Sequence, residues 1–112
     1  MNKVIVESKE LNEQIKQSTE YKRYLDAKKV LYADVYLCNK LKEYKNRNYE
    51  LQSHLGVNLY DEVNALVREY EDVLNNSVVS EFLKAEQHIC KMMQRVFDSI
   101  TDGLELEYLN EQ

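Results

Sequence analysis

The sequence predicts an all-α protein, and three observations carry this prediction. The chain of 112 residues contains no Pro and only two Gly, whereas sheet-rich folds need turn-forming residues at short intervals. Apolar residues make up 44% of the chain and recur at the helical spacing of three and four. Charged residues make up 31% and the mean hydropathy is -0.63, a composition typical of a soluble folded domain. We expect one helical domain over residues 1–112.

Two helices are predicted in the N-terminal half. The first covers about residues 4–17, and Ser18 follows it as a residue that can cap the next helix. From 20 to 55 nothing interrupts the helical pattern, which predicts one amphipathic helix of roughly 50 Å. A compact chain of this size has a radius of gyration of about 13 Å. The second helix therefore needs another element alongside it.

Two more helices are predicted in the C-terminal half. Gly56 can close the long helix and Asn58 can cap the next, which covers about residues 59–74. The last helix covers about residues 78–102 and is expected to fray beyond Gly103. The four helices are predicted to form a long antiparallel helical hairpin with shorter helices packed against it.

The apolar face of the 20–55 helix predicts self-association. Left in water, each large side chain on this face would forgo roughly 1.5–3 kcal/mol of transfer free energy. Pairing between two copies would recover that free energy, so we expect a homodimer or larger assembly. The residues predicted to form the interface are Leu41, Tyr44, Leu51 and Leu55.

The charge distribution disfavours general nucleic-acid binding, because the formal net charge is -5. Residues 1–56 carry 11 basic and 8 acidic groups, whereas residues 57–112 carry 4 basic and 12 acidic groups, so the two halves could attract each other. One basic stretch keeps an alternative open, namely direct RNA binding through the Lys40–Arg47 face. Tyr44 and Tyr49 are interleaved with its cations, and aromatic rings beside cations can stack on bases.

Localisation is predicted to be cytoplasmic, without membrane contact. No stretch approaches the ~20 apolar residues of a membrane-spanning helix, and the N-terminal residues lack the apolar region of a signal peptide. The two cysteines, Cys38 and Cys90, lie in helical patterns. We expect both to be free, buried thiols.

Catalysis is not predicted, and neither is a cofactor or a metal. No Gly-rich phosphate loop is present. His88 and Cys90 are two residues apart on a helix, so their side chains point about 200° apart and do not converge on an ion. Glu50 and His54 share a helix face, but no third ligand is evident. These features predict a non-enzymatic regulator that binds a protein partner of unknown identity.

Nine Tyr and no Trp leave two interpretations open. Tyr is enriched at protein interfaces because its ring is apolar and its hydroxyl is polar. The same residues could instead form the aromatic edge of a core. The sequence favours neither interpretation.

Three stretches resemble the YlbF/YmcA family of small helical bacterial regulatory proteins. They are residues 18–24 (STEYKRY), residues 37–49, and residues 73–86 (VLNNSVVSEFLKAE). The resemblance implies an all-helical, commonly self-associating protein without known catalysis. It further implies a role in competence, sporulation or biofilm formation, or in messenger-RNA processing by RNase Y. Some members carry C-terminal cysteines that hold an iron–sulfur cluster, but residues 102–112 contain no Cys here, so a cluster is not expected.

Overall fold

The computed structural model describes residues 2–53 and 59–106, which contain six α-helices and no strand. The all-α prediction is confirmed, but the predicted number of four helices is wrong. Two of the predicted helices are each divided in the structure. In chain order the helices are α1 (Lys3–Gln17), α2 (Thr19–Tyr32), α3 (Val35–Ser53), α4 (Leu59–Glu69), α5 (Glu71–Leu74) and α6 (Ser77–Thr101).

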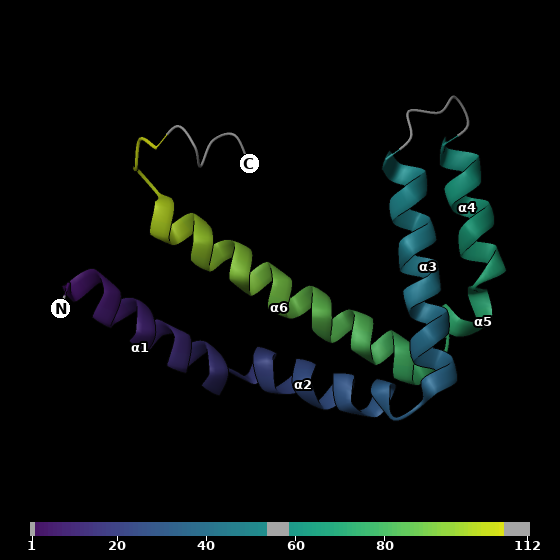
Figure 1. Ribbon diagram of the computed structural model, residues 1–112, viewed down its shortest axis with the longest axis horizontal. Helices are drawn as coiled ribbons and strands as arrows, with labels where there is room; N and C mark the ends of the chain where they lie inside the picture. The colour runs from purple at the N-terminus through teal and green to yellow at the C-terminus, as the bar shows by residue number, and fades with distance from the viewer. Residues whose placement is uncertain (1, 54–58, 107–112) are drawn as a thin grey trace.

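The helices form two arms that meet at an angle (Figure 1). In one arm α6 packs antiparallel to α2, and α1 continues from α2 toward the outer end. In the other arm α3 packs against α4 and α5. The molecule measures 52 × 37 × 17 Å, and its radius of gyration is 18.1 Å against about 13 Å for a compact chain of this length. The protein is therefore flat and extended.

The predicted helix over residues 20–55 is broken at Ala33 and Asp34. The Asp34 Oδ1 atom accepts a hydrogen bond from the Leu37 backbone N–H at 3.1 Å, so Asp34 caps α3 at its first turn. The Ala33 N–H still donates to the Lys29 carbonyl, which completes the last turn of α2. Because the chain turns here, Leu31 and Leu37 reach the same core from two different helices.

The predicted helix over residues 59–74 is divided at Tyr70, which separates α4 from α5. Tyr70 has φ -105° and ψ 17° and is buried, with its ring 5.6 Å from the Tyr44 ring. The kink lets α5 turn its Val73 side chain into the core. The turn predicted at Gly56 and Asn58 lies outside the described residues.

The remaining helix ends are set by local hydrogen bonds. The chain breaks at Ser18, where the sequence predicts a helix start, and the Ser18 hydroxyl accepts a hydrogen bond from the Tyr21 N–H at 3.2 Å. Asn76 caps α6 by accepting from the Val78 N–H at 2.9 Å. The helix ends at Thr101, and Gly103 adopts φ +77°, a conformation that favours glycine.

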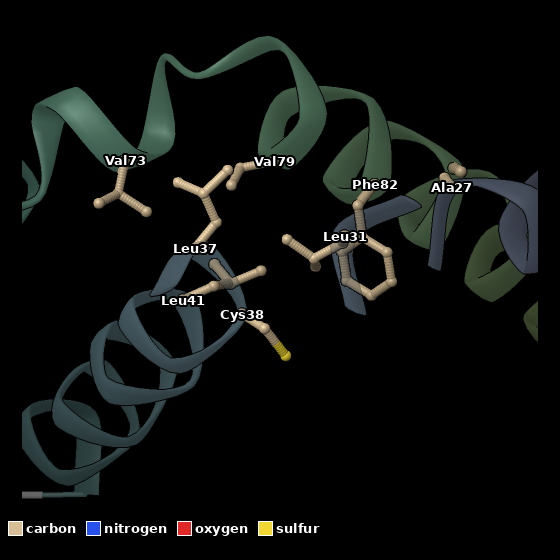
Figure 2. Packing of buried hydrophobic residues seen from close by; sticks show 9 residues of the cluster. Ala27, Leu31, Leu37, Cys38, Leu41, Val73, Val79 and Phe82 are labelled. Atoms are coloured by element: carbon tan, nitrogen blue, oxygen red, sulfur yellow. The ribbon is translucent and has the colours of Figure 1, made fainter. Parts of the chain in front are cut away.

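One hydrophobic core lies where the two arms meet (Figure 2). Four helices contribute to it, and Leu31 and Val79 at its centre are at most 1% exposed. Because both arms share this core, it fixes the angle between them. Its buried members are Ala27, Leu31, Leu37, Cys38, Leu41, Val73, Val79, Phe82 and Ala85.

Candidate interaction surface

The residues predicted to form a dimer interface do not make a continuous exposed stripe. Leu41 is 3% exposed and belongs to the core, and Tyr44 is half-buried against Tyr70. Leu51 is half-buried and lines a hollow with Leu66 of α4. Leu55 lies outside the described residues. An interface at these positions stays a prediction, and the burial of Leu41 directs attention to other surfaces.

Three of the four cations of the Lys40–Arg47 face pair with carboxylates of the same chain. Lys45 Nζ lies 2.9 Å from both carboxylate oxygens of Glu86 on α6. Arg47 forms an ion pair with Glu69 on α4. Lys40 Nζ is 3.6 Å from Glu43. The pairs of Lys45 and Arg47 tie α3 to α6 and α4, whereas the pair of Lys40 lies within α3. Lys42 is the member of the face without a carboxylate partner among the described residues.

A hydrogen-bonded chain of side chains joins α3 to the α4–α5 kink. The Tyr70 hydroxyl donates to Glu43 Oε1 at 2.6 Å and accepts from Arg47 at 3.2 Å. This bond from Tyr70, helped by Lys40 and Arg47, holds the pKa of Glu43 below its usual range. The Glu69 carboxylate, followed by Tyr70, raises the pKa of Arg47. The kink at Tyr70 is therefore held by its side chain.

Replacing Tyr70 with Phe should make the stability less sensitive to acid. Because the pKa of Glu43 is lowered in the folded protein, its contribution is present above the unfolded value of about 4.3 and is lost as the pH falls through the folded value. Tyr70→Phe removes the largest cause of that shift. Urea titrations should therefore show a stability difference between the two proteins near pH 7 that shrinks below about pH 4.3. A difference independent of pH would contradict this assignment.

A second polar cluster joins α2 to α6. Arg23 Nε donates to Glu81 Oε1 at 2.7 Å, and another guanidinium nitrogen lies 2.7 Å from His88 Nδ1. The Glu81 contact raises the pKa of Arg23, and the reciprocal contact lowers that of Glu81. His88 thus contacts Arg23. Across residues 2–53 and 59–106, no three His, Cys, Asp or Glu side chains are grouped so that they could hold a metal ion.

The two cysteines lie in different environments. Cys38 is buried in the core, but Cys90 is exposed on α6, so the prediction that both thiols are buried is wrong for Cys90. The reason is that Cys90 lies about 100° around α6 from the buried Ile89, so its side chain faces solvent. Glu50 is exposed, and its predicted neighbour His54 lies outside the described residues.

An apolar stripe remains uncovered along the C-terminal half of α6. We use the name α6 stripe for Cys90, Met93, Phe97 and Ile100, which recur at the spacing of one helix face. Phe97 is 48% exposed and Ile100 is 58% exposed. The α6 helix has 25 residues whereas α2 has 14, so α6 extends past the end of its partner. The α1 helix continues this arm but diverges from α6, so it does not cover the stripe (Figure 1).

The neighbouring α1 helix adds to the uncovered surface. All its residues are described, and none is buried. Val4 is 70% exposed and Ile5 is 48% exposed. In Figure 1, α1 belongs to the same arm as the C-terminal half of α6, and the two helices diverge toward the outer end. The outer end of this arm therefore presents apolar side chains from both helices.

In the sequence, Met93, Phe97 and Ile100 recur at the spacing of one helix face, but this pattern does not separate the exposed part of that face from the buried part. Once the 20–55 helix is divided at Asp34, its first part is too short to cover α6 along its whole length.

No described helix is long and apolar enough to cross a membrane.

The fold and its surfaces define a small, two-armed all-α protein. A family model described as "Control of competence regulator ComK, YlbF/YmcA" matches residues 4–105. The chain belongs to this family, which confirms the resemblance seen in the sequence. A search of curated proteins and a search of solved structures each found no match to the chain.

Proposed function

We propose that this protein is a non-enzymatic regulator that acts by binding proteins, and that its first partner is a second copy of itself. The observation that carries the proposal is the uncovered α6 stripe together with the exposed apolar residues of α1. The family description supports placing this activity in the control of the competence regulator ComK. Roles in sporulation, biofilm formation and RNase Y-dependent processing stay predictions.

The amount of exposed surface supports the need for a partner. The accessible surface is 9012 Å², whereas a compact monomer of 13.3 kDa exposes about 6,500 Å². Two copies that each buried this excess of about 2,500 Å² would bury about 5,000 Å² in total, the upper end of the range for obligate homodimer interfaces. An extended monomer with exposed Phe, Met and Ile side chains loses transfer free energy that association can recover. A second copy offers the same apolar surface.

Sedimentation velocity of the full chain between about 1 and 100 µM tests this proposal. We expect a dimer or a larger species whose fraction rises with concentration. A single monomeric species across the whole range would contradict the proposal.

Direct RNA binding through the Lys40–Arg47 face is the alternative. The ion pairs of Lys40, Lys45 and Arg47 weigh against it, because each cation would have to leave a carboxylate to reach a phosphate. An RNA titration at several salt concentrations separates the two functions. RNA binding through these cations weakens steeply with salt, whereas association through an apolar stripe does not.

A further inference from the structure

The corner between α2 and α3 carries two lysines whose charges converge on one exposed tyrosine. Lys28 Nζ lies 5.3 Å from the centre of the Tyr32 ring, and Lys42 Nζ lies 5.2 Å from it. Lys28 and Tyr32 belong to α2, whereas Lys42 belongs to α3. The bend at Asp34 therefore creates this arrangement. Tyr32 is 49% exposed, so the cluster is open to solvent.

These two lysines have no compensating carboxylate, unlike Lys40, Lys45 and Arg47 on α3. Within the part of the chain that the structure describes, neither Lys28 nor Lys42 has a carboxylate oxygen within 4 Å. Lys45 also lies over an aromatic ring, that of Phe82, but it is paired with Glu86. Two like charges held near one ring repel each other, and an anion placed between them would remove that repulsion.

A small hollow adjoins the cluster. It has a volume of about 120 Å³ and lies between Tyr32, Lys42 and the Lys45–Glu86 pair, with Phe82 and Cys38 among its other lining residues. One short acidic side chain could enter it. The Lys42 ammonium would donate to its carboxylate, the Tyr32 and Phe82 rings would contact its methylene groups, and Lys28, on the other helix beside Tyr32, would bind the next acidic residue of the segment.

We propose that Lys28, Lys42 and Tyr32 form a docking surface for an acidic segment of a partner protein. The inference rests on the proposed function, because it names the chemistry of a protein partner. An acidic peptide fits better than RNA for two reasons. Two uncompensated cations suffice for a short acidic segment, whereas nucleic-acid sites commonly neutralise about 6–10 phosphates. The Tyr32 ring already has two ammonium groups over it, so it is not free to stack on a base.

The test is fluorescence anisotropy with a fluorescein-labelled decapeptide that alternates Glu with Leu, using the full chain at about 50 mM salt. We compare wild type with K28E/K42E. The matched control is K9E/K22E, which changes the net charge equally at exposed lysines away from the corner that have no carboxylate within 4 Å in the described chain. We expect the dissociation constant to rise at least tenfold in K28E/K42E and less than twofold in the control.

Several results would overturn the proposal. One is that the peptide does not bind the wild type, and another is that both double variants lose binding equally. The third is that a labelled decauridylate binds the wild type more tightly than the peptide does and that K28E/K42E abolishes this binding. The milder variant K28Q/K42Q removes both charges without reversing them, and it should also weaken peptide binding. Loss of binding in both variants at these two positions cannot then be attributed to misfolding of K28E/K42E. Because this corner is separate from the α6 stripe, K28E/K42E should sediment as wild type does. Failure of the docking surface is thereby distinguished from failure of self-association.

Discussion

Phe82→Ala should lower the free energy of unfolding by about 3–5 kcal/mol, the range expected for truncating a buried Phe in a core. Phe82 is 5% exposed and lies in the cluster that joins the two arms. Its ring centre is 5.6 Å from that of Tyr24 on α2 and 5.4 Å from the Lys45 ammonium on α3. The substitution therefore removes contacts to both arms at once. Urea denaturation followed by circular dichroism measures the change.

The chain supplies a matched control, because its only other phenylalanine is Phe97 on the α6 stripe. Phe97 is half exposed, so Phe97→Ala should cost much less when the protein is dilute enough to be monomeric. Equal losses for the two alanine variants under those conditions would contradict the assignment of the core to the junction of the arms.

Phe97→Asp should weaken self-association at least about 100-fold. In a symmetric dimer the substitution occurs twice, so two carboxylates would replace two apolar rings in one interface. Burying an unpaired charge is far more costly than losing an apolar contact. The dissociation constant is measured by sedimentation over a concentration series.

Ser99→Asp is the control for the charge itself. Ser99 is also exposed and lies two residues from Phe97, on a different face of α6. The Ser99→Asp substitution introduces the same charge outside the α6 stripe. We expect it to change the dissociation constant of self-association less than fivefold. If the two variants weakened association equally, the effect would be one of net charge, and the stripe would not be the interface.

Much of the fold follows from the sequence, but the bend between α2 and α3 does not. The helix class follows from the scarcity of Gly and Pro and from the helical spacing of apolar residues. The break at Asp34 has no Gly or Pro to mark it. Asp is tolerated inside a helix as well as at its start, so the hydrogen bond from the Leu37 N–H decides between the two only in the folded protein.

The kink at Tyr70 illustrates the same limit. Tyr70 fits the helical pattern of its segment, and the sequence gives no local reason to interrupt the helix there. The reason is tertiary, because the Tyr70 hydroxyl donates to Glu43, which lies 27 residues earlier in the chain. Contacts at such separation override the local helical preference.

The candidate surface could be predicted only in part. The apolar spacing of Met93, Phe97 and Ile100 is visible in the sequence, but their exposure depends on where α2 ends. The predicted interface at Leu41 depended on an unbroken 20–55 helix. Once the chain bends at Asp34, Leu41 packs into the core. Because the 20–55 helix was predicted without a break, the interface was expected on that helix, whereas the exposed apolar stripe lies on the last helix.

The central claim is that a second copy covers the α6 stripe, and the chain's own cysteines test it most directly. Cys90 lies on the stripe and is exposed in the single chain, whereas Cys38 is buried in the core. The rate of maleimide alkylation at each thiol is measured by mass spectrometry between about 1 and 100 µM protein, with the reagent in excess. We predict that alkylation of Cys90 slows at least tenfold as the concentration rises, while Cys38 reacts slowly throughout. A Cys90 rate that does not change with concentration would contradict the claim.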